Sequence, residues 1–131
     1  MLVIFKKRET GSVSLGPFDA LRFDGAQLYA GKGRQPIASH ENHRWQVRGE
    51  EYLRLDCEGP LTIVFLDGAG TASRLFGPYA HFSSVGGIAY RDHQVFCHLD
   101  EQTKRWYVPS ERRDWPVLLV QEASPQPAGA Q

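Results

Sequence analysis

Two stretches of the chain, LGPFDALRFDG at residues 15–25 and FGPYAHFSSVG at residues 76–86, match at a separation of 61 residues. Aligned with itself at this separation, the chain matches residues 2–50 to residues 63–111 without a gap and with eleven identical positions. Many of the identities are turn glycines and prolines or large strand residues: Gly16 and Gly77, Pro17 and Pro78, Gly25 and Gly86, Tyr29 and Tyr90, Trp45 and Trp106, and Val47 and Val108. A duplicated scaffold is expected to retain such residues, because they fix turns and fill the core. We therefore predict an internal repeat.

Short runs rich in aliphatic and aromatic residues, separated by Gly, Pro, Asp or Asn, follow one another along the chain. No window of eleven or more residues has sustained helical periodicity. In residues 52–57, Leu53, Leu55 and Cys57 alternate with Arg54 and Asp56, which predicts a strand with one buried and one wet face. Residues 61–66 and 117–120 are apolar on both faces and predict central strands.

These patterns predict an all-β protein made of two pseudo-symmetric repeats of about 60 residues. The first unit covers residues 1–60 and the second residues 61–123, while the Pro- and Ala-rich residues 124–131 are expected to be a disordered tail. The repeats could pack as a pair of small barrels of SH3-like or Sm-like build, or form one β-sandwich or barrel.

Charge and cysteine content narrow the class of protein. The 15 cations and 15 anions balance, so the chain lacks the basic excess of a dedicated nucleic-acid binder. The apolar run near the N-terminus is only four residues long, and no segment approaches the roughly 18 apolar residues of a membrane helix. We therefore expect a cytoplasmic protein. Cys57 and Cys97 are expected to be free and buried in a reducing compartment.

The densest polar stretch, residues 39–51, contains His40, His43 and Glu50 and loosely resembles the first metal motif of the cupins. That resemblance implies a divalent cation held by two histidines and a glutamate. The cupin motif places its histidines two residues apart on one strand face, whereas His40 and His43 are three apart and would point to opposite faces. A polar hairpin loop before Trp45 is the alternative interpretation. No zinc motif of closely spaced ligands is present in the sequence.

The other candidate chemical groups are also open to structural interpretations. Cys97 and His98 are neighbours and would point to opposite faces of a strand, so they do not predict a nucleophilic pair. The stretch from Gly31 to Arg34 lacks the rest of a phosphate-binding loop and predicts a hairpin turn. At the 61-residue separation no histidine aligns with another: His40 aligns with Glu101, His43 with Lys104, His81 with Ala20, His93 with Lys32, and His98 with Ile37. The histidines are therefore not part of the common scaffold.

Aromatic residues beside cations mark the candidate binding surface. Trp45 and Trp106 are aligned by the repeat and are expected in the core. Trp115 has no tryptophan counterpart, so we expect it to be an exposed contact together with Arg112, Arg113 and Tyr107.

We expect a small binding or protein-interaction module without catalytic residues or a cofactor. Its partner would be a protein or a small ligand rather than a membrane, and the oligomeric state stays open. One alternative is a single-stranded nucleic-acid binder of Sm-like or OB-like build. A second alternative is a metal-dependent, cupin-like enzyme.

Overall fold

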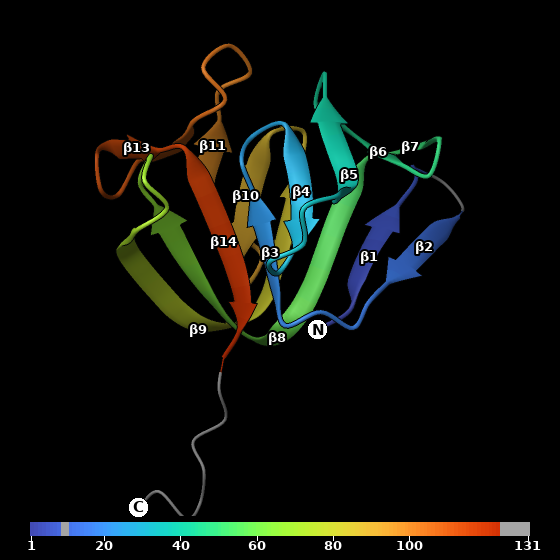
Figure 1. Cartoon of the computed structure of the whole chain (residues 1–131), viewed down its shortest axis with the longest axis horizontal. Coiled ribbons are helices and arrows are strands. Elements are labelled where there is room, and N and C mark those ends of the chain that lie inside the picture. Colours follow the sequence, from blue (N-terminus) through green and yellow to red (C-terminus); the bar gives the residue numbers. More distant parts are fainter. Residues whose placement is uncertain (9–10, 124–131) are drawn as a thin grey trace, which may run out of the picture.

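The computed structural model describes residues 1–8 and 11–123, and this part of the chain is all β, without a helix (Figure 1). In the order of the chain the strands are β1 Val3–Lys6, β2 Ser12–Leu15, β3 Ala20–Phe23, β4 Gln27–Ala30, β5 Pro36–Glu41, β6 Arg44–Val47, β7 Glu50–Tyr52, β8 Arg54–Leu66, β9 Ala72–Val85, β10 Ile88–Arg91, β11 Gln94–Leu99, β12 Trp106–Val108, β13 Arg113–Trp115 and β14 Val117–Glu122. None of the described residues belongs to a helix that could span a membrane. The tail predicted at 124–131 lies outside the described residues.

All strands belong to one large antiparallel sheet. Its order is β13-β12-β11-β10-β9-β8-β14-β3-β4-β5-β6-β7, with β1 paired to β8 and β2 paired to β1. The sheet is not closed into a barrel, because the path ends at β7 on one side and at β13 on the other. The all-β prediction is confirmed, and the barrel architectures are not what the chain forms. As predicted, residues 61–66 and 117–120 lie in strands paired on both sides.

The two longest strands, β8 and β9, bend at the bottom of the molecule, so that each rises on both sides of the sheet (Figure 1). Their pairing register is interrupted between Glu58 and Leu61, around Gly59 and Pro60. Proline donates no backbone hydrogen bond to a ladder. A Cβ atom on Gly59 would lie 2.5 Å from the backbone of both Leu61 and Tyr79, so the close approach of the strands requires glycine here. The predicted boundary between the units, at residues 60 and 61, falls within β8.

One pairing register recurs at the separation found in the sequence. The β3–β4 pairs and the β9–β10 pairs correspond position by position: Leu21↔Ala30 and Phe82↔Arg91, Arg22↔Tyr29 and Ser83↔Tyr90, Phe23↔Leu28 and Ser84↔Ala89. Strands are also exchanged between the two halves, because β3 pairs with β14 and the first part of β8 pairs with the second part of β9. The next pair differs, because Gln27 pairs with Ser39 whereas Ile88 pairs with His98 and not with Asp100, so the repeat stays a prediction.

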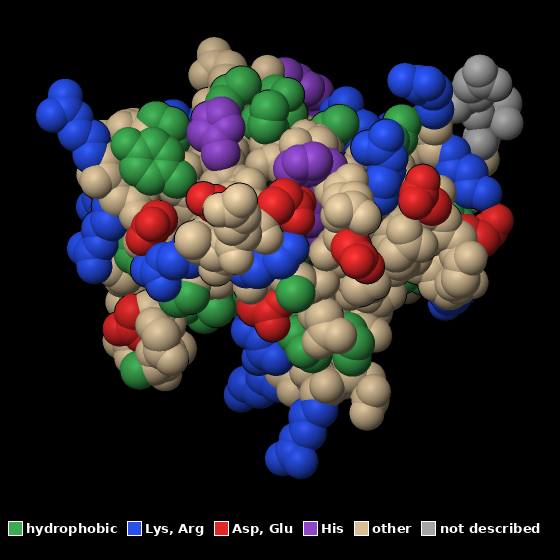
Figure 2. Space-filling view, turned by 90° about the horizontal axis from the view of Figure 1, so that it is seen from above, with side chains coloured by type: hydrophobic (Ala, Val, Ile, Leu, Met, Phe, Trp, Pro, Cys, Tyr) green, Lys and Arg blue, Asp and Glu red, His purple; other side chains and the backbone are tan. Residues whose placement is uncertain are grey.

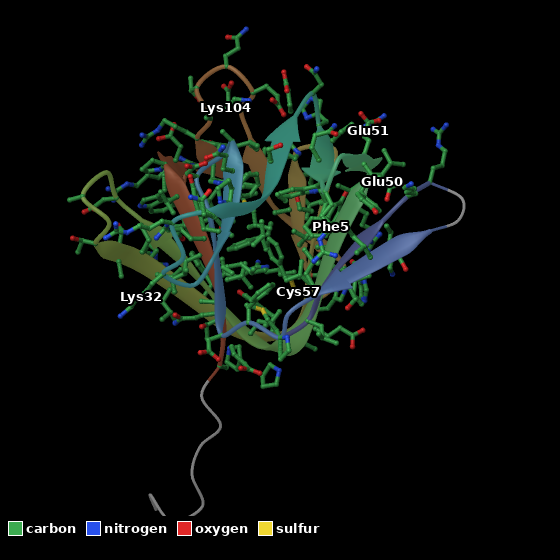
Figure 3. The ribbon with its side chains drawn as sticks, turned by 45° about the vertical axis from the view of Figure 1, so that its right-hand side comes forward. Phe5, Lys32, Glu50, Glu51, Cys57 and Lys104 are labelled. Carbon is green, nitrogen blue, oxygen red and sulfur yellow. The ribbon has the colours of Figure 1, made fainter. Side chains whose placement is uncertain are left out.

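One cluster of buried side chains fills the space enclosed by the curved sheet. Phe23 lies between Trp45 and Trp106, with ring centroids 4.8 Å and 4.9 Å away. Both tryptophans are buried, as the repeat predicted. Cys57 lies in the interior with Phe5 (Figure 3), and both cysteines are free and buried, which confirms that prediction.

A candidate ligand-binding cleft on strands β8 to β10

An open cleft of about 300 Å³ lies over β8, β9 and β10 and is lined by Arg54, Ser83, Val85, Tyr90 and His93. The register places four of these residues, all but His93, in two cross-strand rows on one sheet face. One row is Asp56, Ser83, Tyr90 and Val95, and the other is Arg54, Val85 and Ile88. The volume is at the lower end of the range of small-molecule sites.

Asp56 is a buried charge beside this cleft, across from the lining residue Ser83. It is 4% exposed, although its position on the alternating strand predicted a wet side chain. Arg54 Nε donates to both carboxylate oxygens at 2.8 and 2.9 Å, while Lys6 Nζ lies 3.2 Å and His81 Nε2 3.1 Å from the carboxylate. Lys6 comes from β1 and His81 from β9, so only the pairing of three strands supplies these partners. The ion pairs compensate the cost of burying the carboxylate.

Arg54 is held in a fixed orientation by this contact. Its Nε is engaged by Asp56, and its two terminal nitrogens make no hydrogen bond among the described residues. The side chain is 39% exposed and lines the cleft. A guanidinium fixed at one edge keeps its remaining donors available for a ligand.

The turn between β10 and β11 places His93 at the cleft. Asp92 Oδ1 accepts hydrogen bonds from the backbone N–H groups of Ala80 and His81 at 2.8 and 3.0 Å, and Asp92 N–H donates to the His81 carbonyl. This contact pins the turn on β9. His93 stacks on His81 with ring centroids 4.6 Å apart and an angle of 22°. His81 Nδ1 is buried and has no partner among the described residues.

The corresponding position of the other half is filled. Arg22, which is paired with Tyr29 as Ser83 is with Tyr90, places its guanidinium over the Tyr29 ring at 4.7 Å. Leu119 is paired with Arg22 as Asp56 is with Ser83. Ser83 therefore has a small side chain at the position that corresponds to Arg22. Of the lining residues, Ser83, Val85 and His93 differ from their aligned residues, whereas Tyr90 aligns with Tyr29.

A second polar cluster, which brings together His40, His43, Glu101 and Lys104, lies at the loops after β5 and β11. Glu101 Oε1 is 3.7 Å from His40 Nδ1 and 3.1 Å from His43 Nδ1, and Lys104 Nζ is 2.9 Å from Glu101 Oε2. These are the residues that align in pairs at the 61-residue separation. Figure 2 shows histidine side chains among acidic and basic ones on the upper face. His40 is buried, which lowers its pKa to about 4.

The expected metal set of His40, His43 and Glu50 is not assembled. Glu50 lies on β7 (Figure 3) and binds Lys7 at 2.8 Å. The expectation that the two histidines point to opposite strand faces is also wrong, because β5 ends at Glu41 and His43 lies in a turn with φ of 62°. Within residues 1–8 and 11–123, no three His, Cys, Asp or Glu side chains form a group that could hold a metal ion.

The expectation that Trp115 is exposed is wrong. Its ring is 2% exposed and stacks on Phe65 at 4.9 Å, because Trp115 lies opposite buried Trp106 and shares its inward face. Arg113 covers the ring at 5.1 Å. The side chains of Arg112, Arg113 and Tyr107 are exposed. Their role in binding stays a prediction.

The cysteines are poor nucleophiles. Burial raises the pKa of Cys57 to about 12 and raises the pKa of Cys97 still further above its usual range. Cys97 is buried and His98 is exposed, which confirms that the two neighbours point to opposite faces.

Comparison of the chain with protein-family models, with curated proteins and with solved structures finds no match.

Proposed function

We propose that the protein is a non-catalytic binding module and that its ligand, a small molecule or a side chain of a partner protein, occupies the cleft over β8, β9 and β10. The observation that carries this proposal is that Arg54, which lines the 300 Å³ cleft, is held by two hydrogen bonds to buried Asp56. Polar groups held by ion pairs on paired strands give a binding site its specificity at little ordering cost.

Two further features support binding rather than catalysis. The Asp56 carboxylate is engaged by three side chains, so it is committed to positioning them. Raised thiol pKa values keep both cysteines protonated at neutral pH. Free cysteines also suit the cytoplasmic location that we propose. In this proposal exposed Arg112, Arg113 and Tyr107 form a separate surface for a protein partner.

The test is a fragment screen on the isotopically labelled protein, read by amide chemical shifts. We expect hits to move the signals of Val85, Tyr90 and His93. A Ser83→Arg variant installs the arginine that stands at position 22 and should fill the cleft, which would abolish these shifts. Far-UV circular dichroism establishes that the variant is folded. The proposal is wrong if fragments move only signals elsewhere, or if the folded variant binds as the wild type does.

A second candidate, single-stranded nucleic-acid binding, is favoured by another open cleft. Lys7, Arg8, Arg44 and Tyr52 line it, together with Glu51 and Leu53, in a volume of about 250 Å³. Lys7 also lies over the Tyr52 ring at 5.3 Å. Cations beside an aromatic ring are what a single strand requires, although Glu50 and Glu51 pair with Lys7 and Arg44 here.

The nucleic-acid candidate predicts an affinity that falls steeply with salt when a labelled oligonucleotide is titrated. Absence of binding at about 50 mM salt would exclude it, because screening is weak there.

A further inference from the structure

We infer that the cleft over β8, β9 and β10 recognises an oxyanion, the carboxylate or phosphate group of a small molecule, through Arg54. This inference rests on the proposed function and names the class of its ligand.

The charges around the cleft favour an anion. Lys6 and Arg54 carry one positive charge each, and both pair with the single negative charge of Asp56. His81 also contacts this carboxylate. The five lining residues include no acid. The nearby carboxylate of Asp92 is committed to the backbone N–H groups of Ala80 and His81. In the ion-pair cluster next to the lining, the cations Lys6 and Arg54 therefore outnumber the one carboxylate with which they pair.

Glu58 is the opposing charge. It lies across from His81 on β8 and is exposed. Glu58 does not line the cleft, whereas Arg54 lines it and is held against a buried partner. We therefore expect the guanidinium to dominate the interaction with a ligand in the cleft.

The donors match an oxyanion in kind. A guanidinium binds carboxylate and phosphate through two parallel N–H donors, and Asp56 occupies only the Nε of Arg54. Tyr90 and His93 line the same space, and their side chains can donate to further oxygens, whereas Ser83 lines it but is only 1% exposed. Val85 supplies an apolar wall for the rest of the ligand.

Arg105 offers a matched control. Its Nε also donates to a neighbouring aspartate, Asp114, at 2.9 Å, and its side chain is 42% exposed. Arg105 does not line the cleft. Replacing either arginine by methionine removes one charge and one ion pair, but only Arg54→Met removes a lining donor.

The experiment titrates inorganic phosphate, and separately succinate, into the labelled protein at constant ionic strength. For the wild type and for Arg105→Met we expect saturable shifts of the Arg54 Nε–H signal and of the amides of Val85, Tyr90 and His93. Arg54→Met loses a charged hydrogen bond to the anion, so its affinity should be at least about tenfold lower than that of the wild type. The anion that binds more tightly shows whether the cleft prefers a phosphate or a carboxylate group.

The outcomes separate this inference from the proposed function. If uncharged or cationic fragments occupy the cleft while neither anion saturates, the anion inference is wrong and the binding module stands. If no compound of any charge perturbs the cleft, both are wrong. Equal anion affinity of the wild type and Arg54→Met also overturns the inference. Should Arg54→Met fail to fold, Arg54→Lys keeps the charge without the planar fork, and its affinity should still fall several-fold.

Discussion

Asp56 shows how far one residue's environment can depart from its sequence pattern. Its alternation with Leu55 and Cys57 placed it on a wet face, and it does lie on the outer face of the sheet. It is nevertheless buried, because Lys6, Arg54 and His81 cover it. Alternation predicts the direction of a side chain, whereas its solvent exposure depends on neighbouring strands.

His40 should make the stability of the protein depend on pH. Burial lowers its pKa to about 4, so between pH 6.5 and 4 the unfolded chain binds a proton that the folded chain does not. Stability should therefore fall as the pH drops through this window, by up to about 3 kcal/mol, and this term should not fall further below pH 4. Glu101 and His43 lie beside the ring, and Lys104 is bound to Glu101.

The measurement is urea denaturation from pH 7 to pH 4, with His40→Gln as the comparison. The variant should lose less stability than the wild type over this range, because its side chain takes up no proton. Identical pH dependence in both proteins would show that His40 does not supply it.

Trp115 and Tyr107 should behave oppositely when truncated. Trp115 is buried against Phe65, so Trp115→Ala should lower the free energy of unfolding by about 3–5 kcal/mol. Tyr107 is 44% exposed on the other face of the neighbouring strand, and Tyr107→Ala should change it by no more than about 0.5 kcal/mol. Urea denaturation followed by far-UV circular dichroism measures both. A small effect of Trp115→Ala would contradict the packing described here.

At the scale of elements, turns of one half pack on loops of the other. The β3–β4 turn at Gly25 contacts Lys104, and the β9–β10 turn at Gly87 contacts His43. Lys104 and His43 align at the 61-residue separation. These turns help to hold the two polar loops together at the upper face.

The β3–β4 turn should not tolerate a side chain. Gly25 has φ of +92°, and a Cβ atom there would lie 2.4 Å from the Lys104 carbonyl oxygen. Gly70 has a similar φ of +83° but would place its Cβ atom in open space. Gly70→Ala should lower the free energy of unfolding by about 1 kcal/mol, because of backbone strain alone. Gly25→Ala should lower it by at least about 2 kcal/mol more, because its side chain is also overpacked. Equal melting temperatures of the two variants would contradict this contact.

At the scale of the whole molecule, the exchange of strands should couple the two halves. β3 is paired with β14 and the first part of β8 with β9, while Trp45 and Trp106 contact the same phenylalanine. Neither half can unfold without exposing the pairing edge and the core of the other. We expect a single cooperative transition.

Coincidence of two probes tests this expectation. Tryptophan fluorescence reports Trp45 in one half and Trp106 and Trp115 in the other, and far-UV circular dichroism reports the whole sheet. Their urea transitions should superpose. Two separated transitions would show that the halves unfold independently.

Local sequence patterns predicted much of the fold but little of the candidate site. Apolar residues on both faces marked residues 61–66 and 117–120 as central strands, and the aligned tryptophans marked the core. The sequence pattern indicated Trp115 and the histidines near residue 40 as candidate site residues. It missed Asp56 and His81, whose only signal was that neither aligns with a similar residue in the other half.

The sequence by itself determined that the chain is all β, where its central strands lie and which aromatic residues fill the core, because these depend on side-chain period and local turn chemistry. Only the tertiary structure decided that the strands form one open sheet, that Arg54, Asp56 and His81 converge from two strands, and that Ser83 lines a cleft. The physical reason is that these features depend on which distant strands pair and in which register. A one-residue shift of register would separate the groups that form the cleft.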